Sequence, residues 1–551
     1  MALIEFNNFS FKYNESEDNI LSDINLEVES GDFVLICGPS GCGKTTLLSN
    51  LKKELLPNGI RSGDVKYDNC SVGDLDDLVS ACDIGYLFQN PDAQIVTDSV
   101  IQEIAFPLEN IGTPTEEIRN RISELVSFFG INEILHKNVD ELSNGQKQLV
   151  NLCSLLVLRP KVLILDEPLS QLDPITSYKI LSIIRRLNEE FSITIIMSEH
   201  QLDNIFPLCD KVVFLNNGQI EFNDNPRDVC KNMKDDMVYG HFLPSVCKIY
   251  KLLVDNNPSL ANLDIPLNIR EARRFLNKVP SDIITSSCNL EFSYDSSNET
   301  LIKMKNVYFA YEKHNLIIKN LNFDLRKGDY AAIVGSNGCG KSTLLQILTG
   351  LIDPIKGKVK SKKDLSVAYV HQNPMIHFSH DTVKEELVED NENNSNFKNL
   401  VEFFQIEDLL NQHPYDCSGG EQQKIVIVKA LLKNPDVLVL DEPTKCLDPI
   451  SSKIISDKLK TLHNEGLTII MVSHDLDFVA NNCNRCLMLF DKTIQVDNHP
   501  KNIFVENNFY TTMEAFVNGI YVNYVYAFEA ISLILTIVVV GLVLFNKEVK
   551  S

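Results

Sequence analysis

Residues 38–46 read GPSGCGKTT, and nearly the same nine letters return at residues 335–343 as GSNGCGKST. Both stretches satisfy GxxxxGK[ST], the pattern of a phosphate-binding loop. Both follow an apolar run (DFVLICG, DYAAIVG) and open a helical pattern (TTLLSNLKKEL, STLLQILTGL), which supplies the strand and helix that such a loop requires. The sequence therefore predicts two α/β units, each with its own phosphate-binding loop.

The residue types in these loops suit the phosphates of a nucleotide. Glycines let backbone N–H groups converge on phosphate oxygens at a helix N-terminus, a lysine adds a fixed positive charge, and a hydroxyl is available to Mg²⁺. The hydroxyls for Mg²⁺ belong to Thr45 and Ser342. The expected phosphate contacts are Gly38, Pro39, Ser40, Gly41, Cys42, Gly43, Lys44, Thr45, Thr46, Gly335, Ser336, Asn337, Gly338, Cys339, Gly340, Lys341, Ser342 and Thr343.

Paired carboxylates end two later strand-like runs, KVLILDEP (161–168) and DVLVLDEP (436–443). A buried parallel strand delivers such side chains to a site at its C-terminal edge. Asp166 and Asp441 suit Mg²⁺, whereas Glu167 and Glu442 can polarise a water for attack on the γ-phosphate. A glutamate in that position favours hydrolysis over nucleotide binding alone.

Two further strand-like runs, ITIIMSEH and LTIIMVSH, end in His200 and His474. A single histidine at a strand end is most often structural or exposed, but its recurrence in both halves favours a functional role. Between each loop and each carboxylate pair, ELSNGQKQ (141–148) and DCSGGEQQ (416–423) place Ser-x-Gly at the start of a helical pattern. The serine hydroxyl and the helix N–H groups there face no phosphate of their own half.

With these motifs the chain resembles an ATP-binding cassette (ABC) ATPase that carries two complete nucleotide-binding domains. The resemblance implies an intramolecular ATP sandwich, in which the signature Ser-x-Gly of one domain closes over the ATP and Mg²⁺ held by the other. The first site would comprise Lys44, Asp166, Glu167 and His200 with Ser418 and Gly420. The second would comprise Lys341, Asp441, Glu442 and His474 with Ser143 and Gly145.

Other positions also match the family. Gln89 and Gln372 resemble the glutamines that touch Mg²⁺ and the attacking water while reporting to a membrane partner. Tyr13 and Tyr311 stand where an aromatic ring stacks on adenine, with a core or surface role as the alternative. The resemblance further implies that two aspartates cross the seam between the halves, Asp173 and Asp448.

The expected organisation is two tandem P-loop domains, each with a helical subdomain. We place the first nucleotide-binding domain at 1–235, a small accessory domain at 236–280, a linker at 281–300, the second nucleotide-binding domain at 301–500 and a tail at 501–551. The second half is shorter between phosphate loop and signature, mainly before Gln372 and in the stretch after it. There EDNENNSN (389–396) predicts an exposed polar loop.

A narrower resemblance follows from FQNPDAQIVTDSVIQEIAF and from Pro266, Leu267, Glu271 and Ala272. These residues are similar to the ATPases of energy-coupling factor (ECF) importers and their cobalt-type relatives. The resemblance implies an ATPase at the cytoplasmic face of the cell membrane. It would drive uptake of a vitamin, a vitamin precursor or a transition-metal ion through two separate chains, an integral-membrane coupling subunit and a substrate-binding membrane subunit. The cargo remains open.

Three departures from the family pattern bear on symmetry. Asn144 and Cys417 replace a glycine and a leucine of the two signatures, and Lys445 stands where a small residue is common. None of them removes a catalytic group. We therefore expect two sites that turn over at unequal rates.

The alternative function is that of a soluble twin-domain ABC ATPase acting on ribosomes or nucleic acid, and the net charge of the chain disfavours it. The chain of 551 residues carries a formal net charge of −24, which repels phosphate backbones, so we expect no nucleic-acid partner. The 14 cysteines fit a reduced compartment. Cys483 and Cys486 have a metal-ligand spacing but lack a second pair, which favours a structural role.

The end of the chain is apolar. Residues 530–545, AISLILTIVVVGLVLF, carry no charge, and a candidate membrane helix extends over 525–545. A membrane anchor is the first interpretation. Lys547 and Lys550 would place the C-terminus in the cytosol with the ATPase halves, which a re-entrant or partner-buried helix would satisfy instead.

Overall fold

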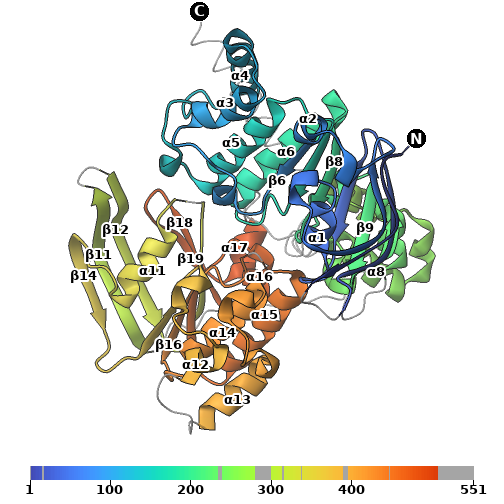
Figure 1. Cartoon of the computed structure of the whole chain (residues 1–551). Helices are drawn as coiled ribbons and strands as arrows, with labels where there is room; N and C mark the ends of the chain where they lie inside the picture. The colour runs from blue at the N-terminus through green and yellow to red at the C-terminus, as the bar shows by residue number, and fades with distance from the viewer. Residues whose placement is uncertain are drawn as a thin grey trace, which may run out of the picture.

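The computed structural model describes residues 2–14, 18–233, 239–279, 299–312, 315–336, 338–388, 395–445 and 447–506. These residues form two α/β units of the same design, one blue to green and the other yellow to red in Figure 1. The predicted fold of two tandem P-loop domains with helical parts is confirmed.

Each unit contains a six-stranded, mainly parallel sheet. In the first unit the order is β10-β9-β3-β8-β7-β6, and the second repeats it as β19-β18-β13-β17-β16-β15. The last strand of each unit, β10 or β19, pairs antiparallel. The strands of the first unit are β3 (Phe33–Cys37), β6 (Ile84–Leu87), β7 (Val162–Asp166), β8 (Thr194–Ser198), β9 (Lys211–Asn216) and β10 (Gln219–Asp224). Those of the second are β13 (Tyr330–Val334), β15 (Val367–Val370), β16 (Val437–Asp441), β17 (Thr468–Val472), β18 (Arg485–Phe490) and β19 (Thr493–Asn498).

The three central strands of each sheet are buried along their whole length. Their composition explains this, because runs such as VLILD and TIIMS are apolar on both faces. The carboxyl ends of β3, β7 and β8 lie side by side, as do those of β13, β16 and β17. Each sheet therefore presents its loops and terminal carboxylates at one edge, where α/β folds bind ligands.

A second, antiparallel sheet covers the phosphate-loop helix of each unit. It contains β1 (Ala2–Tyr13), β2 (Leu21–Glu29), β4 (Gly59–Tyr67) and β5 (Cys70–Ser71) in the first unit. The second unit has β11 (Thr300–Glu312), β12 (Asn315–Arg326) and β14 (Lys356–Ser361). Helices α1 (Lys44–Ser49) and α11 (Lys341–Thr349) pack their leucines into the core between the two sheets.

The helical parts differ in length, as the sequence predicts. The first unit has α2 (Asp77–Asp83), α3 (Val100–Asn110), α4 (Thr115–Phe129) and α5 (Asn144–Leu156). The second has α12 (Val383–Val388), α13 (Ser395–Phe404) and α14 (Gly419–Leu431), and no counterpart of α2 among its described residues. The loop expected at 389–396 lies outside the described residues up to 394, and its last two residues belong to α13 instead.

Beyond the sheets, each unit adds helices to its core. Helices α6 (Pro174–Phe191) and α7 (Pro226–Asn232) belong to the first unit. Helices α15 (Pro449–Asn464), α16 (Leu476–Asn482) and α17 (Pro500–Glu506) belong to the second. Ile450, in the first turn of α15, packs against the core of the first unit. The two units are therefore in contact through α15.

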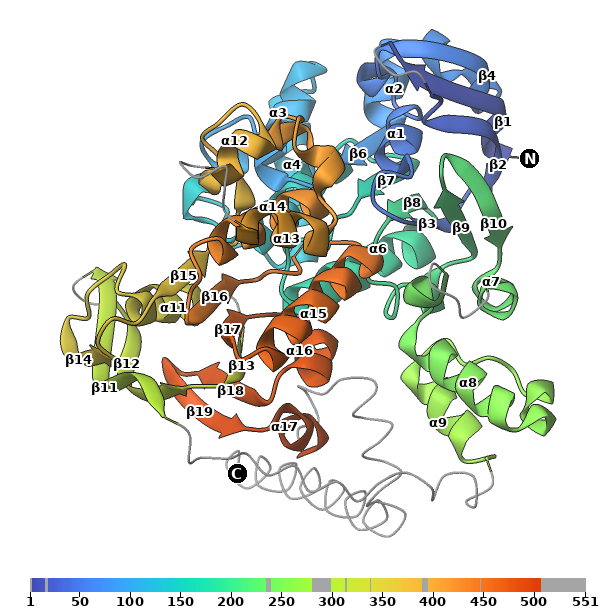
Figure 2. The same cartoon turned by 90° about the horizontal axis from the view of Figure 1, so that it is seen from below.

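The segment after α7 continues with η6 (Tyr239–Phe242), α8 (Ser245–Asn256), η7 (Pro258–Asn262) and α9 (Ile269–Leu276), at the edge of the first unit (Figure 2). Its apolar side chains join the same hydrophobic cluster as β3 and β8. Most of the expected linker and the candidate membrane helix at 525–545 lie outside the described residues. Among the described residues, no helix has the length and apolar character to cross a membrane.

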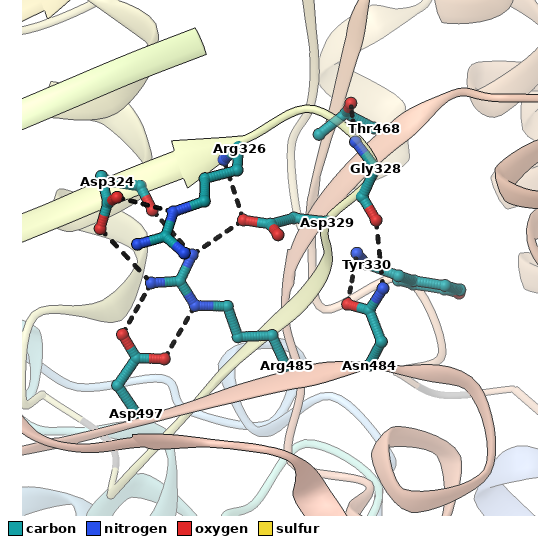
Figure 3. Close-up of polar contacts among 9 residues, drawn as sticks. All are labelled: Asp324, Arg326, Gly328, Asp329, Tyr330, Thr468, Asn484, Arg485 and Asp497. Atoms are coloured by element: carbon teal, nitrogen blue, oxygen red, sulfur yellow. Dashed lines mark hydrogen bonds and ion pairs between the residues drawn. The ribbon is translucent and has the colours of Figure 1, made fainter. Parts of the chain in front are cut away.

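A buried arginine fastens the second unit together (Figure 3). Arg485, at the start of β18, donates to both carboxylate oxygens of Asp497 at 2.7–2.8 Å and to Asp329 at 2.8 Å. Its Nη1 also donates to the carbonyl of Asp324 at 2.7 Å. In the first unit the same strand position is Lys211, whose ammonium donates to the backbone of Glu27 at 2.7 Å. One unit thus uses an ion-pair network where the other uses a single backbone contact.

We expect Arg485→Leu to lower the free energy of unfolding by about 3–5 kcal/mol, because it removes the charged partner at 2.8 Å from the buried carboxylate of Asp329. Denaturant unfolding followed by circular dichroism measures the effect. Lys211→Leu is the matched control, and its loss of one hydrogen bond is expected to cost about 1 kcal/mol. Equal costs for the two variants would contradict a special role for the arginine network.

Candidate functional site

The phosphate-binding loops occupy the predicted place, between β3 and α1 and between β13 and α11. A Cβ atom at Gly38 would collide with the carbonyl oxygen of Leu215, and one at Gly335 with that of Leu489. Both glycines also have a positive φ, which side-chain-bearing residues rarely adopt. Backbone packing therefore requires glycine at the start of each loop, apart from any contact with phosphate.

The two loop lysines are buried and held alike. Lys44 donates to the carbonyls of the first two loop residues, Gly38 and Pro39, at 2.9 and 3.0 Å. Lys341 makes the same two bonds in its own loop, both at 3.0 Å. Burial lowers the pKa of Lys341. Each ammonium group is thus fixed against the backbone of its own phosphate-binding loop. A fixed positive charge beside a loop of backbone N–H groups suits the binding of an anion.

In the first unit the strand-end aspartate is held by hydroxyl groups. Ser198 donates to Asp166 at 2.7 Å and Tyr86 donates at 3.3 Å, and the Thr45 hydroxyl is near enough to favour the ionised carboxylate. Burial raises the pKa of Asp166. The predicted pair of Thr45 and Asp166 is therefore brought together in one site.

The second unit repeats this arrangement, except that strand β17 ends in Val472 where strand β8 ends in Ser198. The hydroxyls of Ser342 and Tyr369 donate to Asp441 at 3.1 and 3.2 Å. Burial again raises the pKa of Asp441. Neither tyrosine was among the residues predicted from the sequence, although GYLFQN and AYVHQN place one three residues before each predicted glutamine. Their recurrence was the available signal.

The adjacent glutamate lies among the predicted polar groups. In the first unit Gln89 donates to Glu167 at 2.7 Å, and Nε2 of His200 lies 2.7 Å from the other carboxylate oxygen. Glu167 has a φ of 44°, in the left-handed region. Such strain costs about 1–3 kcal/mol and gathers at functional sites. The backbone thus aims the carboxylate away from the strand and toward the histidine.

In the second unit the contacts are looser and a cation is added. Gln372 donates to Glu442 at 3.5 Å, and Nε2 of His474 lies 3.0 Å from that carboxylate. Lys445 places its ammonium 3.7 Å from Glu442. At the same position in the first unit, Ser170 donates its hydroxyl to a backbone carbonyl at 2.9 Å. The departure noted in the sequence therefore lies directly against the candidate base.

Both glutamates remain ionised despite their burial. Burial opposes ionisation, but the neighbouring histidine outweighs it and lowers the pKa of Glu167 and of Glu442. Lys445 adds to this effect only in the second unit. Lys445 is therefore a charge difference between the two candidate bases, because a nearby cation disfavours protonation of a carboxylate.

The signature serines begin helices α5 and α14. Ser143 forms a capping box with Gln146, and Ser418 forms one with Glu421. Among the described residues, the hydrogen bonds of both serines stay within these helix starts. The structure does not join either serine to a phosphate-loop residue by a hydrogen bond, so their role across the halves stays a prediction.

The signature glycines have a packing requirement of their own. A Cβ at Gly145 would collide with Thr176 of α6, and one at Gly420 would lie 2.9 Å from the hydroxyl of Ser451 in α15. Each signature helix thus approaches the helix that follows the aspartate of its own half. Glycine permits this approach because it has no side chain.

The structure shows what surrounds Asn144 and Cys417, the two residues that depart from the signature pattern. Asn144 donates its amide to Gln171 at 3.4 Å, which ties the first signature to the segment before Asp173. Cys417 is buried in the core of the second unit, as the leucine expected there would be. Neither substitution interrupts its helix.

The two predicted crossing aspartates both face the opposite half. Asp448 interacts with the hydroxyl of Ser40 in the phosphate loop of the first unit. Burial opposes ionisation of Asp448, but this interaction and the hydrogen bonds at the start of α15 outweigh it and lower its pKa. Asp173 acts on the charge of Lys341 in the second phosphate loop. Residues of each half therefore reach the loop of the other.

The two tyrosines expected to stack on adenine flank the phosphate loops. The hydroxyl of Tyr13 lies 3.1 Å from that of Thr46, and the hydroxyl of Tyr311 lies 3.3 Å from that of Thr343. Both rings are exposed, so each has a free face beside a loop. Asn337 of the second loop lies outside the described residues.

The donor set of each site fits Mg²⁺ with a nucleotide. One hydroxyl and one carboxylate meet there, and Mg²⁺ usually keeps several waters and binds phosphate oxygens through few protein ligands. No group of three or more histidine, cysteine, aspartate or glutamate side chains in the described part of the chain forms a metal cage. Cys483 and Cys486 are buried in the second core as free thiols.

Comparisons with known proteins agree with this site. The family model described as "ABC transporter" matches residues 21–170 and 318–445. A Bacillus thuringiensis protein provisionally named an ABC transporter ATP-binding protein is 41% identical over 530 residues, 93% of this chain and 94% of its own. A Bacillus subtilis protein provisionally named an HMP/thiamine import ATP-binding protein is 29% identical, over 91% of this chain and 92% of its own.

A solved structure shares the whole two-unit fold. The archaeal ribosome recycling factor, crystallised with a ribosomal stalk protein, matches with a TM-score of 0.59 and 22% identity, covering 91% of each chain. At that identity the match speaks for the fold alone. The family match and the Bacillus relative together show that this chain belongs to the ABC transporter family, as an ATP-hydrolysing protein with two ABC domains.

Proposed function

We propose that this chain is the energy-coupling ATPase of an ECF-type importer. The observation that carries the proposal is the presence of two complete hydrolytic sets on one chain whose halves are in contact, with Ile450 of one half packed on the core of the other. Neither half lacks a base, a histidine or a loop lysine. Such a pair of sites suits a machine that closes on ATP and reopens after hydrolysis.

The residues that resemble those of ECF importers include Leu267 and Glu271, which make hydrogen bonds at the start of α9. Leu267 donates its N–H to Glu271 at 3.0 Å at the start of α9, and Glu271 pairs with Arg227 of α7 at 3.0 Å. This pair ties the segment after the first domain back to that domain. The likeness to the HMP/thiamine import protein spans this segment and supports the importer proposal.

The proposed chemistry assigns one proton transfer to each site. Glu167 or Glu442 accepts a proton from a water that attacks the γ-phosphate, while His200 or His474 holds that carboxylate in place. Lys44 and Lys341 hold the phosphates, and Ser418 with Gly420 or Ser143 with Gly145 complete each sandwich from the other half. Mg²⁺, when bound with the nucleotide, neutralises negative charge that develops on the phosphates.

We further propose that the motion passes to membrane subunits through the surfaces beside Gln89 and Gln372. Exposed apolar side chains follow both glutamines, Val96 in the first unit and Met375 and Ile376 in the second. These surfaces differ in residues and in the length of the helices around them, which suits two non-identical contacts. The protein would then lie at the cytoplasmic face of the cell membrane.

Among cargoes, the name of the Bacillus subtilis relative favours HMP or thiamine over other vitamins or metal ions. The experiment that tests the importer proposal is purification of the protein from native membranes. We expect an integral-membrane coupling subunit and a small substrate-binding membrane subunit to accompany it with bound ligand. Sedimentation with ribosomes, without membrane proteins, would instead favour the second candidate function, action on ribosomes.

The two sites are expected to contribute unequally to ATP hydrolysis. The cation of Lys445 lies 3.7 Å from Glu442, whereas the matching residue beside Glu167 is Ser170, so we expect Glu167→Gln to remove most of the steady-state rate, about tenfold or more. Glu442→Gln should remove about half or less. Phosphate release measured in each variant tests this, and equal residual rates would argue against asymmetry.

A second set of variants tests whether Lys445 causes the difference in rate between the two sites. In the Glu167→Gln chain, Lys445→Ser installs the residue found at the matching position of the first unit. We expect the remaining rate to rise about threefold or more, since removal of a nearby cation strengthens Glu442 as a base. Ser170→Lys in the Glu442→Gln chain is the reciprocal control, and it should lower the rate of the first site.

A further inference from the structure

The two halves differ at the residue that precedes the strand-end histidine. The first half has Glu199 and the second has Ser473. Their backbones are placed alike, because each donates its N–H at 3.3 Å to the strand that leads into the phosphate loop, at Ile36 or Ile333. The difference therefore lies in the side chains alone.

The Glu199 side chain is buried between two functional segments. Only 2% of the residue is exposed. One carboxylate oxygen accepts the N–H of Leu169 at 2.7 Å, and the other accepts the N–H of His200 at 3.2 Å. A single carboxylate thus joins the histidine backbone to the segment that follows Glu167.

That segment leads directly to the second site. Residues 169–173, here termed the crossing loop, begin at Leu169 and end at Asp173, which acts on Lys341 in the opposite phosphate loop. The hydroxyl of Ser473 instead bonds within its own loop, accepting the N–H of Asp475 at 3.1 Å. The carboxylate link from histidine to crossing loop is thus present in the first half, whereas the matching serine turns back on its own segment.

We propose that Glu199 is a positioning residue of the first ATP site, which holds His200 and the crossing loop in one arrangement. The proposal rests on the roles proposed above for Glu167 and His200. It goes beyond them because it assigns to Glu199 a link between His200 and the crossing loop, whereas the matching Ser473 bonds within its own segment.

The charged groups around Glu199 make the proposed link depend on pH, which can be measured. Burial raises its pKa to about 8, helped by Glu167 and Asp166 and opposed by the two N–H groups that it accepts. Glu199 and His200 also line a cavity of about 100 Å³ between the halves. The titratable groups that the second half contributes to this cavity are Glu442, Lys445, His474 and Asp475.

The direction of the pH effect follows from the two hydrogen bonds. An ionised carboxylate accepts both N–H groups, whereas a protonated one uses one oxygen as a hydroxyl. The link is therefore complete above pH 8 and weakened below it. Glutamine resembles the protonated form because it keeps one acceptor, and serine is too short to keep either bond.

The test compares Glu199→Ser and Glu199→Gln in the full-length chain, in a Glu442→Gln background that leaves the first site as the source of hydrolysis. We expect Glu199→Ser to lower the rate about tenfold or more and Glu199→Gln to stay within about threefold at pH 7. The unsubstituted Glu199 chain should gain rate over the Gln variant as pH rises through 8. Ser473→Ala, measured in a Glu167→Gln background, is the matched control and should change the rate less than about twofold.

Hydrogen exchange at the Leu169 amide adds a measurement that does not depend on turnover. Exchange should be about tenfold faster in Glu199→Ser than in Glu199→Gln, because only the latter keeps an acceptor. The proposal is overturned if both variants match the parent in rate, pH profile and exchange, or if both lose rate equally with no pH difference. Loss of the hydrolytic role is a separate result, seen when Glu167→Gln leaves the first-site rate unchanged.

Discussion

Two neighbouring carboxylates buried at the end of a central strand are the constraint around which each half is built. Leaving Asp166 and Glu167 ionised in an apolar sheet is costly unless other polar groups compensate. The neighbouring strands provide that compensation, with Ser198 from β8 and Tyr86 from β6 bonded to Asp166. Strand order is thus tied to chemistry, since β7 lies between the strands that carry these hydroxyls.

The second carboxylate is handled differently, because it must face the nucleotide. The left-handed backbone at Glu167 and at Glu442 turns the side chain out of the sheet and toward the histidine at the end of the next strand. The stiff central sheet can hold this strained conformation because its three middle strands are buried on both faces. Rigidity of the core and reactivity of the site therefore have one cause.

Much of this architecture could be predicted from the sequence, because each motif carries its own physical requirement. The loop glycines, the strand-end carboxylates and the two histidines were recognisable since backbone geometry and charge restrict which residues stand there. Tyr86 and Tyr369 were harder to find, because an aromatic residue in a strand is ordinary and only its position relative to the glutamine is informative. Gly145 and Gly420 were read as ligand contacts, yet each also has a packing reason that depends on the distant helix it approaches.

Contacts between the two halves could not be predicted from local sequence patterns. No local pattern predicts the packing of Ile450 on the first core or the interaction of Asp448 with Ser40, because both depend on how two folded units meet. Family resemblance, rather than physical pattern, pointed to the crossing aspartates.

The duplicated backbone and the divergent side chains together explain how one chain can hold two similar but unequal sites. Matching positions keep the groups that any hydrolytic site needs, while differences gather just behind them, at Lys445 against Ser170 and at Glu199 against Ser473. Each of these side chains touches either the catalytic glutamate or the segment that reaches across to the other half. A separate homodimer could not maintain such differences, because both of its sites would share one sequence. Divergence between the two halves of the sequence therefore permits the two sites to differ, because each site draws on its own set of side chains.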